Sequence, residues 1–160
     1  MDKALVAYFS ATGTTERIAG DLAAAIGADL FRIEPETPYE GADLDWRDAT
    51  SRATIEMNDD ACRPPIKAAV GHMGDYDTIF LGFPIWWYVE PRVIDTFLEA
   101  HDLAGKTIVP FATSGSSAIT RASERISTLV PKATVLGGSV LGGSPSQEQL
   151  AGWAIRILGA

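Results

Sequence analysis

Apolar and polar positions along the chain alternate between two patterns. Five short runs are mostly apolar and rich in branched or aromatic residues, and the first of them is nearly all apolar. A strand buried on both faces of a parallel sheet shows such a continuous run. The pattern therefore predicts strands at Leu5–Phe9, Leu30–Ile33, Asp77–Phe83, Thr107–Ala112 and, more weakly, Thr134–Leu136.

Between these runs, apolar residues recur three or four positions apart, which is the spacing of one helix face. In Thr14–Ile26, for example, Ile18, Leu22 and Ile26 are four residues apart, and Gly27 follows as a typical helix stop. The same spacing predicts helices at Pro91–Ala100, Ser117–Leu129 and Ser146–Leu158. Strands that alternate with helices indicate a three-layer α/β sandwich, a parallel sheet with helices on both faces.

The stretch from about 35 to 66 interrupts this alternation. It is long and polar, and within it only Arg47–Met57 has a pattern compatible with a helix. The chain shows no repeat, low-complexity tract or linker. We therefore interpret the stretch as an insertion in a single domain that spans residues 1–160.

The loop after the first predicted strand concentrates hydroxyl groups at the start of a helix. Backbone N–H groups at a helix N-terminus lack partners within the helix, and the helix dipole favours an anion there. The loop has no lysine and no GxxxxGK pattern, so its neutral donors suit a terminal monophosphate better than a nucleoside triphosphate. A simple helix cap would need fewer hydroxyls. The sequence predicts a phosphate site at Ser10, Thr12, Gly13, Thr14 and Thr15.

An aromatic group follows the third predicted strand. In an open parallel sheet, ligands bind beyond the carboxyl ends of the strands, and large aromatic side chains there can stack on a flat ring system. We expect Trp87, and next Trp86, to lie beside such a ring, while at least one of the three aromatics packs into the protein. The candidate residues of this loop are Pro84, Ile85, Trp86, Trp87 and Tyr88.

Together these loops resemble those of flavodoxins. The pattern Ser10-x-Thr12-Gly13-x-Thr15 after a buried strand is similar to the flavodoxin phosphate loop. The segments Tyr76–Trp87 and Pro110–Ser116 are similar to the second and third flavin-contacting loops. The resemblance implies one bound FMN. It also implies that Thr113, Ser114 and Gly115 supply backbone donors to the pyrimidine end of the flavin ring.

The resemblance covers nearly the whole chain. It implies a flavodoxin-like fold with a five-stranded parallel sheet of order 2-1-3-4-5. The segment Leu44-Asp45-Trp46 and the residues that follow it are similar to the insertion between the second and third strands in one bacterial branch of flavodoxin-like proteins. For Trp46 itself we expect a packing role, with recognition of a substrate as the alternative.

Two departures from the electron-carrying flavodoxins leave the function open. The turn Pro84–Trp87 lacks the usual glycine, and the third loop lacks the aromatic that usually covers the other face of the ring. An open face suits a hydride donor or a quinone. We expect an FMN-binding protein that acts in electron transfer. One alternative is an NAD(P)H-dependent quinone or small-molecule reductase, and a second is a flavin-free binding module.

Composition narrows the class of partner. A formal net charge of -8 argues against nucleic acid, whose phosphates require clustered lysine and arginine. The single cysteine, Cys62, allows no internal disulfide and no thiolate metal site, so we expect a reducing cytoplasm. No apolar run approaches the roughly 18 residues of a membrane span. We therefore expect a monomer or homodimer that meets a redox partner protein or a small-molecule acceptor, with no nucleic acid and no membrane.

Overall fold

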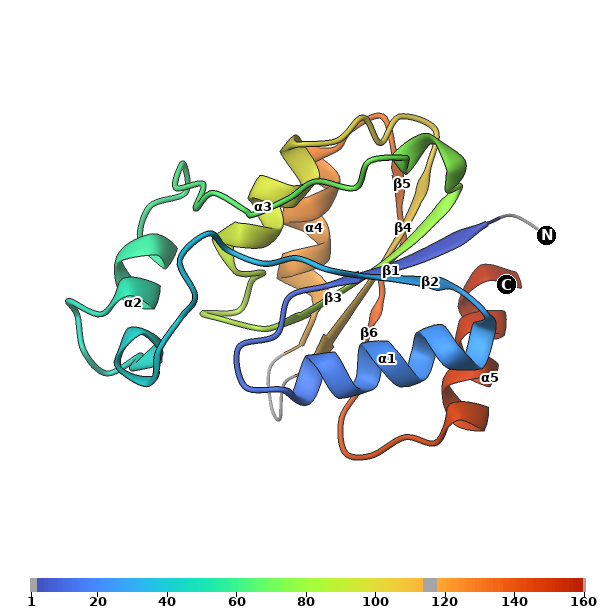
Figure 1. The fold of residues 1–160 in the computed structure, drawn as a ribbon, viewed down its shortest axis with the longest axis horizontal. Helices are drawn as coiled ribbons and strands as arrows, with labels where there is room; N and C mark the ends of the chain where they lie inside the picture. The colour runs from blue at the N-terminus through green and yellow to red at the C-terminus, as the bar shows by residue number, and fades with distance from the viewer. Residues whose placement is uncertain (1–2, 114–117, 160) are drawn as a thin grey trace.

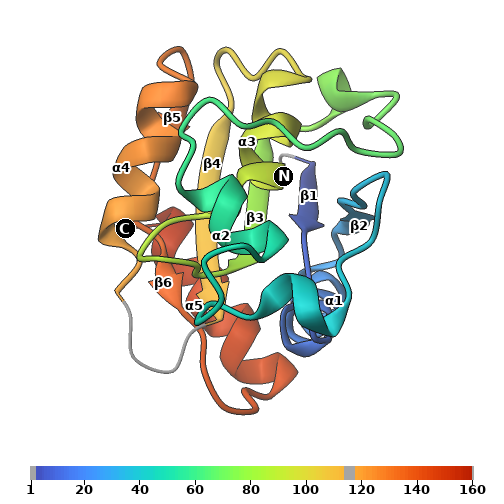
Figure 2. The same ribbon diagram turned by 90° about the vertical axis from the view of Figure 1, so that its left-hand side faces the viewer.

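The computed structural model describes residues 3–113 and 118–159, and within them six strand segments form one parallel sheet (Figures 1 and 2). The order is β2-β1-β3-β4-β5, with β6 also paired to β4. The predicted order 2-1-3-4-5 is therefore confirmed. The segments are β1 Ala4–Tyr8, β2 Asp29–Arg32, β3 Thr78–Pro84, β4 Thr107–Thr113, β5 Thr134–Val135 and β6 Ser139–Val140.

The fifth position of the sheet is divided, where the sequence predicted the single strand Thr134–Leu136. On either side of Pro110, carbonyl groups of β4 accept hydrogen bonds from the backbone N–H groups of Leu136 and Leu141. Pro110 is two residues from each of them, so its backbone faces the same neighbouring strand. As a proline it has no N–H to donate to that strand. Opposite it, Gly138 has φ +73°, and a Cβ there would lie 2.3 Å from the Pro110 carbonyl oxygen. The neighbouring strand therefore breaks into β5 and β6.

Four helices cover the two faces of the sheet. Figure 1 shows α3 and α4 on one face and α1 and α5 on the other, which confirms the predicted three-layer sandwich. Reciprocal hydrogen bonds cap α5: Ser146 N donates to Gln149 Oε1 at 2.8 Å, and Gln149 N donates to Ser146 Oγ at 3.1 Å. The helices are α1 Thr14–Ile26, α3 Arg92–Glu99, α4 Thr120–Leu129 and α5 Gln147–Gly159.

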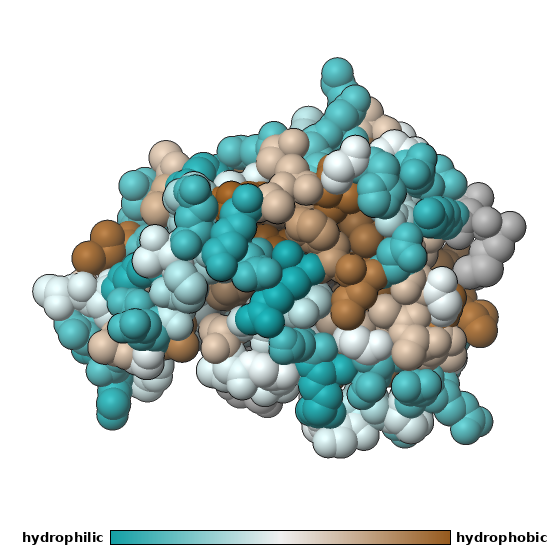
Figure 3. All heavy atoms as spheres, viewed as in Figure 1, coloured by the Kyte–Doolittle hydropathy of each residue, from teal (hydrophilic) through white to brown (hydrophobic). Residues whose placement is uncertain are grey.

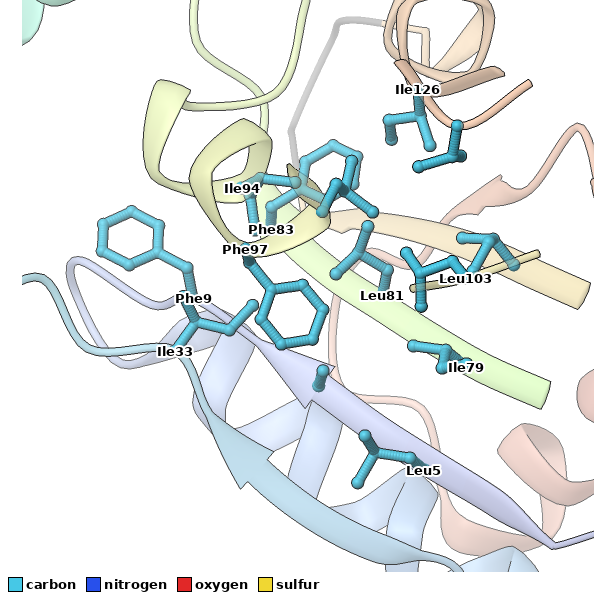
Figure 4. Close-up of a cluster of buried hydrophobic side chains, with 14 of the residues drawn as sticks. Leu5, Phe9, Ile33, Ile79, Leu81, Phe83, Ile94, Phe97, Leu103 and Ile126 are labelled. Atoms are coloured by element: carbon cyan, nitrogen blue, oxygen red, sulfur yellow. The ribbon is translucent and has the colours of Figure 1, made fainter. Parts of the chain in front are cut away.

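Alternate residues of the central strands supply two apolar cores. Those that face α3 and α4 include Leu5, Ile79 and Leu81, and they meet Ile94 and Phe97 of α3 (Figure 4). The intervening residues face α1 and α5 and pack against both helices: Val6, Tyr8, Phe80, Val109 and Phe111. On the face drawn in Figure 3, apolar residues lie in small separate groups among hydrophilic ones.

The insertion projects beyond the carboxyl ends of the strands, where Figure 2 shows α2 in front of the sheet. It contains a 3₁₀ turn, η1 Gly41–Leu44, and the helix α2 Arg52–Met57, and a second 3₁₀ turn, η2 Met73–Asp75, precedes β3. The predicted helix Arg47–Met57 is wrong in its first five residues. Asp48 Oδ1 accepts hydrogen bonds from the N–H and the hydroxyl of Thr50, which holds this part as a turn.

Among the helices of the described residues, none combines the length and the hydropathy needed to span a membrane.

Candidate functional site

The carboxyl ends of three central strands meet at one edge of the sheet. At the end of β1, Phe9 N donates to the Gly82 carbonyl of β3 at 3.0 Å. Pro84 at the end of β3 is paired in register with Thr113 at the end of β4. The loops that follow β1, β3 and β4 therefore start side by side, which brings together the three predicted parts of the site.

The loop after β1 opens the N-terminus of α1. Gly13 occupies the N-cap position with φ +98°, a conformation that residues with a side chain rarely adopt. Ser10 Oγ accepts a hydrogen bond from Gly13 N at 3.0 Å, and no side chain of the described residues caps the helix. Thr12 and Thr14 are exposed. Exposed hydroxyls beside an uncapped helix N-terminus make this loop suitable for a phosphate.

Thr15 has a different environment from the other threonines of this loop. Its side chain is only 2% exposed, and its Oγ1 lies 2.7 Å from Oγ1 of Thr113. This hydrogen bond joins the loop after β1 to the end of β4. The structure thus brings the predicted residues Thr15 and Thr113 together, whereas Ser114 and Gly115 lie outside the described residues.

The loop after β3 forms a tight hairpin turn, Trp86–Val89, which we call the aromatic turn. Trp86 and Val89 exchange backbone hydrogen bonds of 2.9 and 3.1 Å. Between them Trp87 and Tyr88 have φ +48° and +70°, which for such residues costs roughly 1–2 kcal/mol each. Their side chains are 39% and 59% exposed. The turn therefore holds two aromatic side chains at the surface in a strained conformation.

Trp86 is the aromatic of this loop that packs into the protein. Its ring meets Phe9 edge-on at 5.7 Å and Tyr39 at 5.4 Å between centroids. The preceding residues Pro84 and Ile85 are half-buried. Trp87 and Tyr88 are thus the candidates of this loop that are placed to stack on a ligand.

Tyr39 connects the insertion to the aromatic turn. Its hydroxyl donates a hydrogen bond to Glu56 of α2, and the Arg52 guanidinium lies 3.8 Å from its ring centroid. Burial, and next the hydrogen bond to Glu56, raise the pKa of Tyr39 above its usual range. Arg52 also lies 2.9 Å from the Glu56 carboxylate. The Tyr39 ring is therefore fixed between α2 and Trp86.

A buried charged cluster follows the aromatic turn, formed by Glu90, Arg92, Asp95 and Arg125. Arg125 lies 2.7 Å from Asp95 and 3.3 Å from Glu90. Burial, and next the neighbouring Asp95, raise the pKa of Glu90 to about 9. One atom of each buried member, Glu90 Oε1, Arg92 Nη1 and Asp95 Oδ1, has no hydrogen-bond partner among the described residues. The cluster contains a carboxyl that is neutral at pH 7 because of its surroundings.

Arg92 also binds the insertion. Its guanidinium donates to the carbonyl oxygens of Met57 and Asp59, at 2.9 and 3.1 Å, and to Asp60 Oδ1 at 2.9 Å. This role of Arg92 was not predicted from the sequence. By helical spacing, Arg92 and Asp95 lie away from the apolar face of Val93, Ile94 and Phe97, where a solvated charge is expected, so the sequence carried no signal of this role.

A hollow separates the insertion from the aromatic turn. It has a volume of about 330 Å³ and is lined by Leu44, Trp46 and Ala53 on one side and by Ile85–Tyr88 on the other. The side chain of Trp46 is 71% exposed. The expectation that Trp46 packs against the protein is therefore wrong, because its indole borders an open hollow.

Comparison with known proteins gives the same assignment as the three loops. A family model described as flavodoxin matches residues 3–157. A candidate flavoprotein from Bacteroides eggerthii is 45% identical with a TM-score of 0.91, and the alignment covers 99% of each chain. A candidate flavoprotein from Bacteroides uniformis is 47% identical, with a TM-score of 0.91 and coverage of 96% of this chain and 97% of that one.

A more distant structure shares the fold. The flavoprotein from Lactobacillus acidophilus, solved in complex with FMN, is 20% identical, has a TM-score of 0.74, and is matched over 96% of this chain and 99% of that one. Among curated proteins, none matches the chain. The family model and the Bacteroides relatives confirm the resemblance drawn from the loops, and the chain belongs to the flavodoxin family.

Proposed function

We propose that the protein binds one FMN and transfers electrons through it. The observation that carries this proposal is the arrangement at the carboxyl edge of the sheet. An uncapped helix N-terminus lined with hydroxyls lies next to a strained turn that displays Trp87 and Tyr88. The first suits a phosphate and the second a flat ring, which are the two ends of FMN.

Each part of the site has a distinct task. The backbone N–H groups at the start of α1, with the hydroxyls of Ser10, Thr12 and Thr14, would hold the phosphate. Trp87, and beside it Tyr88, would orient the ring and exclude water from one of its faces. FMN supplies the redox chemistry when it is bound, while the protein sets its position and its electrostatic surroundings.

The relatives support this assignment. The Lactobacillus acidophilus flavoprotein of the same fold was solved with FMN bound. Both Bacteroides relatives, at 45% and 47% identity, are described as candidate flavoproteins. The partner that we propose is either a redox protein or a small molecule, met by a monomer or a homodimer in the cytoplasm.

A second candidate function is reduction of a small molecule by NAD(P)H through the flavin. The observation in its favour is the hollow beside the aromatic turn, because a pure electron carrier that meets protein partners has no need of a pocket for a small molecule.

Titration of the purified protein with FMN, followed by tryptophan fluorescence, tests the proposal, with riboflavin as a control that lacks the phosphate. We expect FMN to quench the fluorescence and to bind at least about 100-fold more tightly than riboflavin, since a phosphate makes several charge-assisted hydrogen bonds. Equal binding of the two would contradict the phosphate site. Absence of any FMN binding would refute the proposal and leave a flavin-free binding module.

Anaerobic addition of NADPH to the FMN-loaded protein then separates the two candidate functions. Rapid loss of the flavin absorbance supports the reductase. A flavin that NADPH leaves oxidised, but that a chemical reductant reduces, supports the electron carrier.

A further inference from the structure

The hollow between the insertion and the aromatic turn has the lining of a binding site for a flat apolar molecule. Four of its lining residues are aromatic, Trp46, Trp86, Trp87 and Tyr88, and none of its described lining residues is charged. Its volume of about 330 Å³ lies at the lower end of the range for small-molecule pockets. Aromatic walls of this kind offer faces for stacking and few groups for hydrogen bonds.

Both walls of the hollow are held in place from behind. On the side of the insertion, Arg92 binds the carbonyl groups at the end of α2, and Ser51 Oγ accepts from Thr54 N at its start. On the side of the turn, Trp86 is packed between Phe9 and Tyr39. Since the supports are buried or half-buried, the hollow is formed before any ligand arrives, which lowers the cost of binding.

Trp46 stands on this preformed wall without a packing partner that covers it. An indole that is 71% exposed gains little stability for the fold, and burying it under a ligand would be favourable. Ile55 of α2 is similarly exposed, at 58%, but it does not line the hollow. The two residues therefore make a matched pair for testing the hollow.

We infer that this hollow binds the molecule with which the flavin exchanges electrons, and that this molecule is planar, aromatic and uncharged. Trp46 determines its specificity by stacking against it. The inference rests on the proposed function and narrows the partner to a small molecule. A dinucleotide would need groups for its pyrophosphate, which the lining of the hollow does not offer.

Menadione and its sulfonated analogue, 1,4-naphthoquinone-2-sulfonate, are suitable probes because they share a bicyclic ring but differ in charge. Arg121 lies 5.6 Å from the Tyr88 ring centroid and would favour the anionic probe if charge decided binding. We expect the FMN-loaded protein to bind menadione saturably and at least as tightly as the sulfonate. Preference for the sulfonate would overturn the assignment of an uncharged partner.

Variants of Trp46 and Ile55 test the site itself. We expect Trp46→Ala to weaken menadione binding by about 10-fold, Trp46→Phe to restore most of it, and Ile55→Ala to change it by less than about 2-fold. The FMN dissociation constant should be the same in all four proteins. Stopped-flow reoxidation of the reduced flavin by menadione should show a matching change in half-saturation, with the limiting rate preserved.

The possible failures are distinguishable. Loss of FMN from Trp46→Ala would assign this wall to the flavin site and overturn the inference, leaving the proposed function intact. Menadione binding that ignores Trp46, or that never saturates, would overturn it as well. A parent protein that binds no FMN at all would refute the proposed function and the inference together.

Discussion

The loop Ser10–Thr15 and the aromatic turn Trp86–Val89 lie at the same edge of the sheet but are built in different ways. In the first, Gly13 is the N-cap of a helix, and Ser10 Oγ accepts a hydrogen bond from the N–H of Gly13, three residues later. The groups suited to bind a phosphate there are mainly backbone N–H groups. In the second, two residues adopt positive φ values and depend on supports that are distant in sequence. The first loop is thus a local structure, and the second is held by tertiary contacts.

Removing Arg92 is the strongest test of this dependence on tertiary contacts. Arg92→Met keeps much of the side-chain volume but leaves the carbonyl groups of Met57 and Asp59 without their donor and removes the positive charge 3.7 Å from the buried Asp95. Loss of one partner from a buried ion pair typically costs about 3–5 kcal/mol. We expect the free energy of unfolding in urea to fall by that amount.

Lys67→Met is the control for this variant, because Lys67 and Glu34 form an exposed ion pair at 3.4 Å. Exposed pairs contribute at most about 1 kcal/mol. If Arg92→Met were as mild as Lys67→Met, the aromatic turn and the insertion would not depend on the charged cluster.

Variants of Thr12 and Thr15 in the phosphate loop distinguish a residue that binds FMN from one that stabilises the fold. Thr12 is exposed, so Thr12→Ala should weaken FMN binding by about 1.5–3 kcal/mol, the value of a hydrogen bond to a charged group, and leave unfolding of the flavin-free protein unchanged. Thr15 is buried against Thr113, so Thr15→Val should lower the free energy of unfolding by about 1–3 kcal/mol. Parallel FMN titrations and urea unfolding curves check both. Equal effects of the two variants on both measurements would contradict the division.

Features that depend on local contacts could be predicted from the sequence, whereas those that depend on distant contacts mostly could not. The strands, the helices and the capping of α5 by Ser146 and Gln149 depend on periodicity and on neighbours within a few residues, whereas the strand order was implied by the resemblance to flavodoxins. The phosphate loop belongs to this group, because Gly13 and its hydroxyl neighbours are contiguous. The hydrogen bond between Thr15 and Thr113 was not predicted, and it joins residues 98 positions apart.

Apart from the local turn of Asp48 and Thr50, the features that escaped prediction join distant segments. Pro110 and Gly138 divide the fifth strand only because they meet across the sheet. The charged cluster assembles from α3, α4 and Glu90, which precedes α3, and no single stretch of sequence shows it. The exposure of Trp46 follows from how Arg92 and Tyr39 place the insertion, and an indole in a polar stretch does not reveal whether it is covered.

The pH dependence of stability should arise on the side of the aromatic turn. The pKa of Glu90 is about 9 in the folded protein, whereas an unfolded chain releases this proton near pH 4.5. Between those values the folded state binds one more proton. This group alone therefore makes the free energy of unfolding fall as pH rises, by up to about 1.4 kcal/mol per unit.

Glu90→Gln removes this titration while it keeps a neutral group of similar shape beside Asp95 and Arg125. Urea unfolding of both proteins from pH 5.5 to 9 should show a parent that loses stability relative to the variant as the pH rises. Parallel curves over this range would mean that Glu90 is already ionised in the folded protein.

The smallest effect concerns strain in the aromatic turn itself. At Tyr88, with φ +70° and a side chain 59% exposed, asparagine tolerates the backbone better than alanine. We expect Tyr88→Asn to be about 1 kcal/mol more stable than Tyr88→Ala, with both weakening FMN binding alike since both lose the ring. At Ile55, in the helix α2, the order should reverse, because alanine favours a helix. If the alanine variant were the more stable one at both positions, the positive φ of Tyr88 would not lower the free energy of unfolding, and the turn would not be strained.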